Sequence, residues 1–112
     1  MYVQELYNLS ESNFKGKVIF PTSEITRCIG KTTFLVEQAV KEDGIYINNH
    51  TGCVLAKKIN PNVNTLDAYH FDPSEINSNV PLFIDENTTI TQQDLCKFNR
   101  YIMMKYYPTI RS

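Results

Sequence analysis

The part of this chain with the clearest chemical potential is Gly-Lys-Thr-Thr at residues 30–33. An apolar run precedes it at 17–20, and a run with helical periodicity follows it at 34–41. Backbone N–H groups at a helix N-terminus point toward an anion, and the helix dipole favours negative charge there. Strand, loop, Gly-Lys-Thr and helix is the order in which a phosphate-binding loop is built, so a nucleoside triphosphate such as ATP is the first ligand to consider.

Each residue of this segment has its own task in such a site. Gly30 lets the backbone approach the phosphates, Lys31 supplies a mobile positive charge, and the Thr32 hydroxyl is a ligand for Mg²⁺. Ile29 and Thr33 flank these three and complete the predicted nucleotide-binding set.

The loop departs from the usual signature at its start. The first glycine is expected five positions before Gly30, where this chain has Ile25. A β-branched residue tolerates positive φ poorly, so the loop cannot copy the usual backbone path unchanged. The alternative interpretation is a plain helix N-terminus, in which Thr32 or Thr33 caps the helix and Lys31 is a solvated surface charge.

A second chemical element lies at 80–86, where an apolar run ends in Asp85 and Glu86. The run predicts a buried parallel strand whose carboxyl end presents its acids to the crevice where ligands bind in α/β sheets. We expect Asp85 to hold Mg²⁺ together with Thr32, and Glu86 to orient and deprotonate the water that attacks the γ-phosphate. The alternative is a strand that ends in a turn, with Asn87 or Thr88 starting the next helix.

In this order, the two elements resemble the nucleotide-binding half of a P-loop NTPase, with a degenerate Walker A and a Walker B-like segment. More narrowly, the chain resembles the small, divergent P-loop ATPase-like proteins of bacteriophages, in which Arg-Cys-x-Gly-Lys-Thr-Thr is typical. Arg27 and Cys28 match that loop as well. The resemblance implies ATP and Mg²⁺ as ligands, Lys31 and Glu86 as catalytic residues, and a location in the host cytoplasm if the protein is phage-encoded.

Composition limits the remaining function classes. The 112 residues predict a single domain, 1–112, which is small for a motor ATPase. Hydrophobic residues at 42%, charged residues at 21% and a net charge of −1 predict an ordinary soluble globular protein rather than a basic nucleic-acid binder, and the N-terminal sequence described next predicts a cytoplasmic location. The sequence lacks a secretion signal and a membrane-length apolar run, so we expect no membrane association. Binding to nucleic acid stays an open possibility, although the net charge does not indicate it. A protein partner or a homo-oligomer also stays open.

The cysteines and histidines predict no metal centre. Cys28, Cys53 and Cys96 lie too far apart for a compact zinc site, and their odd number favours reduced thiols. We interpret Cys53 and Cys96 as small apolar fillers of the core. His50 and His70 have no partner at ligand spacing.

The pattern as a whole predicts an α/β fold with a small, mainly parallel sheet and flanking helices, a truncated version of the P-loop NTPase architecture. The expected strands lie at 17–20, 45–47 and 80–84, and the expected helices at 31–42, 51–58 and from Thr89 or Thr91 to Pro108. Residues 1–8 are expected to form an irregular edge, and 60–79 to form a long loop with a short strand or turn at 65–71. Whether the first and third strands are neighbours stays open.

The last expected helix carries more apolar side chains than one sheet face requires. The excess residues are Met103, Met104, Tyr106 and Tyr107, and they predict a patch for self-association or a partner.

Two classes of function remain. The first is an ATP-binding P-loop protein with weak or partner-dependent, Mg²⁺-dependent ATP hydrolysis. The alternative is a non-enzymatic, phage-type interaction protein that keeps the fold while its site has decayed. Ile25 favours the alternative, and the retained Lys31, Thr32, Asp85 and Glu86 together favour the first.

Overall fold

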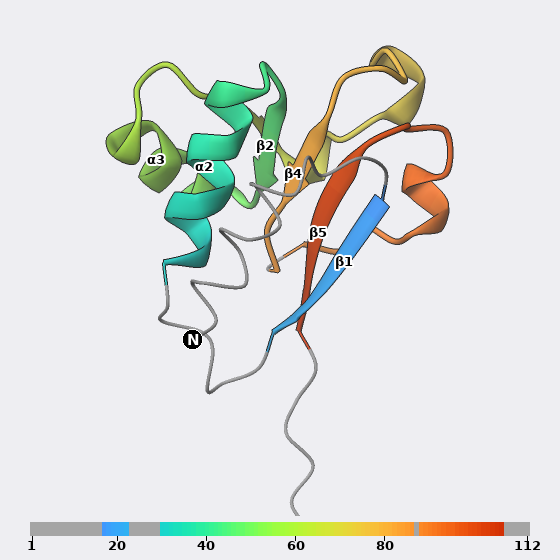
Figure 1. Ribbon diagram of the computed structural model, residues 1–112, viewed down its shortest axis with the longest axis horizontal. Helices are drawn as coiled ribbons and strands as arrows, with labels where there is room; N and C mark the ends of the chain where they lie inside the picture. The colour runs from blue at the N-terminus through green and yellow to red at the C-terminus, as the bar shows by residue number, and fades with distance from the viewer. Residues whose placement is uncertain (1–16, 23–29, 87, 107–112) are drawn as a thin grey trace, which may run out of the picture.

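A computed structural model describes residues 17–22, 30–86 and 88–106 of the chain. Its centre is a five-stranded sheet with the strand order β1-β5-β4-β2-β3, in which every neighbouring pair is parallel (Figure 1). The elements are β1 (Lys17–Thr22), α2 (Lys31–Lys41), β2 (Ile45–Asn48), α3 (His50–Ile59), β3 (Asn64–Asp67), β4 (Leu82–Ile84) and β5 (Tyr101–Tyr106). Short 3₁₀ turns lie at 68–70, 73–75 and 93–95.

The register of the sheet brings the carboxyl ends of its central strands to one edge. Ile84, the last residue of β4, pairs with Ile47 on one side and with Met103 on the other. Asp85 follows directly, and its backbone N–H still donates to the Ile47 carbonyl at 3.0 Å. Acidic side chains that follow β4 are therefore held at the edge where ligands bind in parallel sheets.

Helix α2 forms because its apolar positions repeat at helical spacing. Phe34, Leu35, Val36 and Ala39 are buried against the sheet, whereas Glu37 is exposed. The helix starts after Gly30, whose φ of 68° is left-handed, and it ends where the N–H of Glu42 bonds to the carbonyl of Gln38.

The sheet has a different cover on each face. Helices α2 and α3 lie together on one face (Figure 1). The apolar cluster on this side comprises Phe34, Leu35, Val36, Ala39, Tyr46, Ala56, Val63, Phe83, Ile102 and Met104. On the other face the 3₁₀ turns and loops pack over Ile47, Leu82, Ile84, Ile90, Leu95, Phe98, Tyr101 and Met103. Because both faces of the central strands are covered, the sequence of these strands is a nearly continuous apolar run rather than an alternating pattern.

The predicted parallel sheet with flanking helices is confirmed, but the predicted helix from Thr89 or Thr91 to Pro108 is wrong. A 3₁₀ turn at 93–95 is followed by β5, which lies between β1 and β4. Residues 101–104 are all buried because the strand is covered on both faces. Periodicity alone does not separate such a strand from a buried helix. The insertion of β5 also separates the first strand from β4.

Other expectations need smaller corrections. Strand β1 extends to Thr22, α3 starts one residue before Thr51, and the strand expected near 65–71 is β3 followed by a 3₁₀ turn. The predicted apolar patch is wrong for Met103 and Met104, which are 3% and 2% exposed within the sheet. Residues 1–8 and Tyr107 lie outside the described residues. Neither α-helix of the described part has the length and apolar character that a bilayer crossing demands.

Candidate functional site

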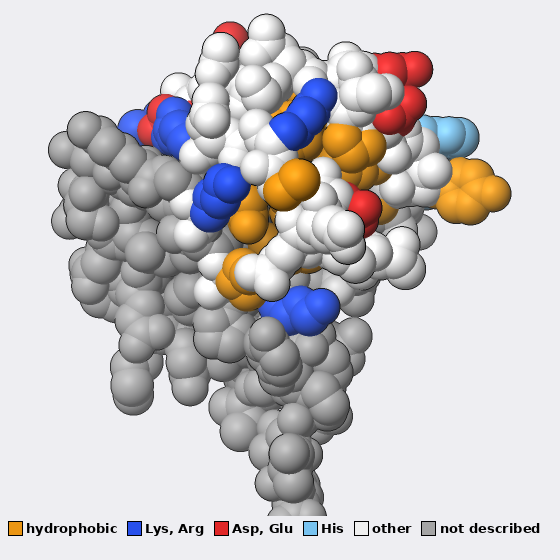
Figure 2. All heavy atoms as spheres, turned by 90° about the vertical axis from the view of Figure 1, so that its right-hand side faces the viewer, with side chains coloured by type: hydrophobic (Ala, Val, Ile, Leu, Met, Phe, Trp, Pro, Cys, Tyr) orange, Lys and Arg blue, Asp and Glu red, His pale blue; other side chains and the backbone are white. Residues whose placement is uncertain are grey.

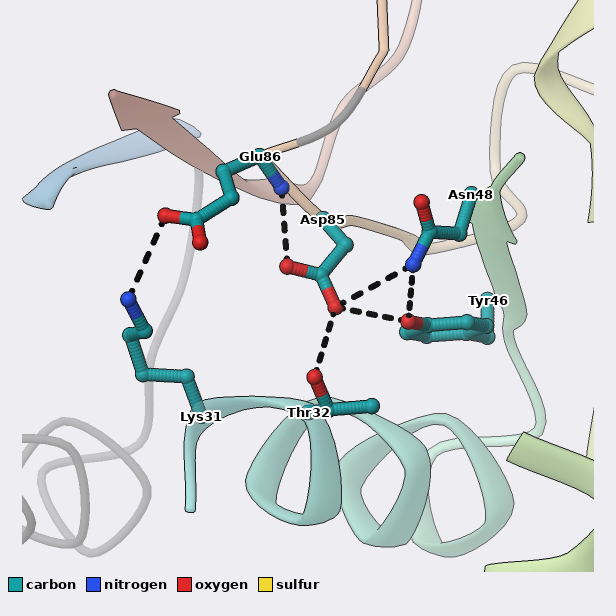
Figure 3. Close-up of polar contacts among 6 residues, drawn as sticks. All are labelled: Lys31, Thr32, Tyr46, Asn48, Asp85 and Glu86. Carbon is teal, nitrogen blue, oxygen red and sulfur yellow. Dashed lines mark hydrogen bonds and ion pairs between the residues drawn. The ribbon is translucent and has the colours of Figure 1, made fainter. Parts of the chain in front are cut away.

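Four of the predicted site residues meet at the carboxyl edge of the sheet (Figure 3). Lys31 and Thr32 are the first two residues of α2, and Asp85 and Glu86 directly follow β4. The Thr32 hydroxyl donates to Asp85 Oδ2 at 2.9 Å, and Lys31 Nζ lies 3.2 Å from Glu86 Oε2. Residues more than fifty positions apart thus form two adjacent polar contacts between one helix start and one strand end.

Asp85 is the centre of the network and is only 4% exposed. Its Oδ2 accepts hydrogen bonds from the Tyr46 hydroxyl at 2.6 Å and from Asn48 Nδ2 at 3.4 Å, in addition to the bond from Thr32. Its Oδ1 accepts from the backbone N–H of Glu86 at 2.8 Å. A buried carboxylate is tolerated when its lone pairs are satisfied in this way, and the bonds fix its orientation.

Lys31 and Glu86 form a buried ion pair, because their side chains are 3% and 7% exposed. The interpretation of Lys31 as a solvated surface charge is therefore wrong. So is capping by Thr32 or Thr33, because the residue at the N-cap is Gly30 and no side chain caps the helix. Removal of one partner from a buried pair leaves an uncompensated charge and costs about 3–5 kcal/mol. An anion that engages Lys31 must compete with Glu86 for it.

Tyr46 and Asn48 belong to the site although no sequence motif marks them. They lie two residues apart on β2, so both side chains point to the helix-covered face, where Asn48 Nδ2 donates to the Tyr46 hydroxyl at 2.7 Å. Burial first and the adjacent Asp85 carboxylate second raise the pKa of Tyr46. Its hydroxyl therefore stays protonated and donates to Asp85. The sequence signal that could have found this pair is Asn48, a polar residue at the end of an apolar strand.

The same asparagine connects the network to α3. Asn48 Oδ1 accepts from the backbone N–H of Asn49 at 2.7 Å, and the Asn49 side chain caps α3 by accepting from the N–H of Gly52 at 2.8 Å. A Cβ atom on Gly52 would lie 2.0 Å from Asn48 Nδ2. Glycine at this position therefore lets the first turn of α3 approach the network.

The remaining predicted nucleotide-binding residues have different outcomes. Gly30 adopts the left-handed conformation that glycine favours, which is a conformational reason for glycine here, and apart from its chain neighbours no described atom lies within 4 Å of a Cβ atom placed on it. Thr33 lies in the first turn of α2 and is half-buried, outside the contacts of Figure 3. Ile29 lies outside the described residues, as do Ile25 and the loop 23–29 as a whole.

A cavity of about 300 Å³ lies beside the network. Lys31, Thr32, Asp85 and Glu86 line one side of it, and the first turn of α3 together with Leu55 lines the other. The cavity is large enough for a small ligand, and the charged groups of the site face it.

The donors at this edge fit Mg²⁺ better than a softer metal. The Thr32 hydroxyl and the two carboxylates are oxygen ligands, and Mg²⁺ is commonly held by one or two carboxylates together with substrate phosphates. Within residues 17–22, 30–86 and 88–106, no three His, Cys, Asp or Glu side chains gather closely enough to hold a metal ion on their own. The donor set therefore suits a cation that arrives with a phosphate ligand.

The two cysteines of the described part differ in their surroundings, and the Cys53 thiol lies next to the network, where it donates to the backbone carbonyl of Asn48 at 3.5 Å. Cys53 is buried, as predicted, and its burial raises the pKa of the thiol, which favours an unreactive neutral form. Cys96 is exposed, so its interpretation as a core filler is wrong. Cys28 lies outside the described residues.

Comparisons with protein-family models, with curated proteins and with solved structures found no match to this chain. The resemblance to P-loop NTPases therefore rests on the sequence motifs alone and stays a prediction.

Proposed function

We propose that the protein binds a nucleoside triphosphate, ATP in the first instance, as its Mg²⁺ complex, in a P-loop NTPase-like site at the start of α2. The observation that carries the proposal is the meeting of Lys31 and Thr32 with Asp85 and Glu86 at one edge of a parallel sheet. The first helical hydrogen bond of α2 is the one from Phe34 N–H to the Gly30 carbonyl. The N–H groups of residues 31–33 thus have no partner within the helix and suit phosphate oxygens.

The charges of the site explain why the nucleotide would arrive with a cation. One lysine faces two carboxylates, so the formal charge of the four residues is −1 and a bare triphosphate is repelled. Thr32 and Asp85 would hold Mg²⁺, and the bound cation would neutralise part of the negative charge of the phosphates. Tyr46 and Asn48 act as positioning residues, because their hydrogen bonds fix the Asp85 carboxylate.

Hydrolysis would follow from a change of partner at Lys31. When Lys31 Nζ turns to the phosphates, the Glu86 carboxylate, which lines the cavity, loses this ion pair. It then accepts a proton from a water molecule as that water attacks the γ-phosphate, and the P–O bond to the nucleoside diphosphate breaks. The six residues drawn in Figure 3 include no arginine, and we expect the rate to be low unless positive charge is supplied from elsewhere in the chain or by a partner.

The alternative function is a non-enzymatic interaction protein with a decayed site. The observation that favours it is the completeness of the existing network, since Asp85 already has its hydrogen bonds and Lys31 its counter-ion. Such a network stabilises a fold without any ligand.

Calorimetric titration of MgATP separates the two functions. We expect micromolar binding by the wild type, loss of binding in Lys31→Ala, and unchanged binding in Lys41→Ala, which removes an exposed lysine from the other end of the same helix. Circular dichroism checks that each variant is folded. Absence of binding in the folded wild type, or equal binding by wild type and Lys31→Ala, would contradict the proposal and favour the interaction protein.

Phosphate release tests the role of Glu86. Glu86→Gln is expected to keep MgATP binding and to lose phosphate release by about 10²-fold or more, because the amide does not accept the proton of water. If release by Glu86→Gln equals that of the wild type, the glutamate is not the base.

A further inference from the structure

A second cavity, of about 310 Å³, lies on the sheet face opposite the helices. Its apolar lining comes from Ile45, Leu66 and Ile76, which pack on the cluster of that face. Its polar lining includes His70, Asp72 and Glu75. None of these residues belongs to the network around Asp85, so this is a separate surface.

The cavity borders the open edge of the sheet. Strand β3 is last in the strand order and pairs only with β2 in the described part of the chain. The outer N–H and C=O groups of an edge strand are a template for another strand. Asn64 and Leu66 share the face of the cavity, because they are in register with Ile45 and Ile47. A strand added along β3 would therefore place every second side chain over this cavity.

The acidic side chains that line this cavity favour a partner side chain of positive charge. Asp72 and Glu75 are exposed, and neither forms an ion pair with another described residue. Hydrogen bonds from Ser74 lower the pKa of Asp72, and the positive charge of Lys97 acts in the same direction. Figure 2 shows acidic side chains gathered along one edge of the molecule, beside a histidine and a protruding hydrophobic side chain and apart from most Lys and Arg side chains. Tyr69, next to His70, is 91% exposed.

We propose that β3 and this cavity bind an extended segment of a partner protein, whose backbone pairs with β3 and whose lysine or arginine side chain enters the cavity. The methylene stem of that side chain would lie on Ile45, Leu66 and Ile76, and its charged head would reach Asp72 and Glu75. Main-chain pairing supplies affinity in this mode, and the pocket for alternate side chains supplies specificity. The inference goes beyond nucleotide binding and does not depend on it.

The test uses the full chain and four blocked, fluorescein-labelled pentapeptides of the form Thr-Val-X-Val-Thr, with X as Lys, Arg, Gln or Glu. We expect fluorescence anisotropy to detect the Lys and Arg peptides with at least about tenfold higher affinity than the Glu peptide. The double variant Asp72→Asn, Glu75→Gln should lose about fivefold to tenfold of that affinity. Asparagine retains the side-chain oxygen that accepts from Ser74 N–H, so the turn is kept. The matched control Glu37→Gln removes an exposed acid from α2 and should bind as the wild type does.

Two further measurements test the mode of binding. Amide hydrogen exchange at 64–67 should slow when the Lys peptide is bound, and a peptide N-methylated at alternate residues should not bind. The peptide assays contain no nucleotide, so that failure of the nucleotide proposal is seen separately. Equal affinity for the Lys and Glu peptides, no binding of any peptide, or unchanged exchange at 64–67 overturns the proposal. A stable dimer of the protein alone, with slow exchange at 64–67, also overturns it, because the occupant is then a second copy.

Discussion

Replacement of Tyr46 by phenylalanine tests whether the network around Asp85 holds the fold together. The ring stays and one hydroxyl is lost, together with the 2.6 Å bond it donates to Asp85 and the 2.7 Å bond it accepts from Asn48. A hydrogen bond to a charged group contributes about 1.5–3 kcal/mol and one between neutral groups about 0.5–1.5 kcal/mol. We therefore expect the free energy of unfolding to fall by about 2–4 kcal/mol, and Tm by roughly 10 °C.

Urea denaturation followed by circular dichroism measures this loss. The midpoint should fall while the m-value stays constant, because the variant exposes the same surface on unfolding. Tyr69→Phe is the matched control, since this tyrosine is 91% exposed and its hydroxyl should contribute less than about 0.5 kcal/mol. Equal midpoints for Tyr46→Phe and Tyr69→Phe would refute the reasoning, because the buried hydroxyl would then contribute no more than an exposed one.

Three further predictions concern the same region. Gly52→Ala places a Cβ atom 2.0 Å from Asn48 Nδ2, so we expect a loss of about 1–3 kcal/mol in urea denaturation, and equal stability would contradict the close approach. Gly30→Ala meets no atom of the described residues beyond its chain neighbours but must keep a φ of 68°, so the expected loss is about 1–2 kcal/mol, and a stabilised variant would be inconsistent with that conformation. Burial and Asp85 raise the pKa of Tyr46 in the folded state, so its contribution is complete below the unfolded pKa of about 10 and falls as pH rises above it, by up to about 1.4 kcal/mol per pH unit. Stability measured from pH 8 to 11 should therefore decline less steeply in Tyr46→Phe than in the wild type, and parallel curves would refute the assignment.

The sequence predicts helix α2 and the acidic end of β4 well, because their signals are local. Helix α2 has an apolar stripe and a glycine at its start, and both are visible within one window of the chain. The acids after β4 were expected at the carboxyl edge because parallel strands end there, and Asp85 lies at that edge.

Strand β5 was not predictable in the same way. Residues 101–104 are buried on both faces by neighbours distant in sequence, so their pattern carries no period of two. The side chains that complete the site escaped prediction for a related reason. A tyrosine and an asparagine on an apolar strand match no known motif spacing. Their role in the site depends on Asp85 at the end of β4, a strand that lies beside β2 only after folding.

If the site binds nucleotide as proposed, its closed network constrains which ligand it accepts. A phosphate oxygen can take Lys31 only by separating it from Glu86, and an unpaired buried charge costs about 3–5 kcal/mol when nothing replaces its partner. A ligand with one phosphate group contacts Lys31 and leaves the carboxylates unbalanced. A triphosphate that arrives with a cation replaces the partner of Lys31 and compensates the acids in the same event. The ion pair therefore favours a phosphate chain that arrives with a cation, and MgATP should bind more tightly than AMP if the site works as proposed.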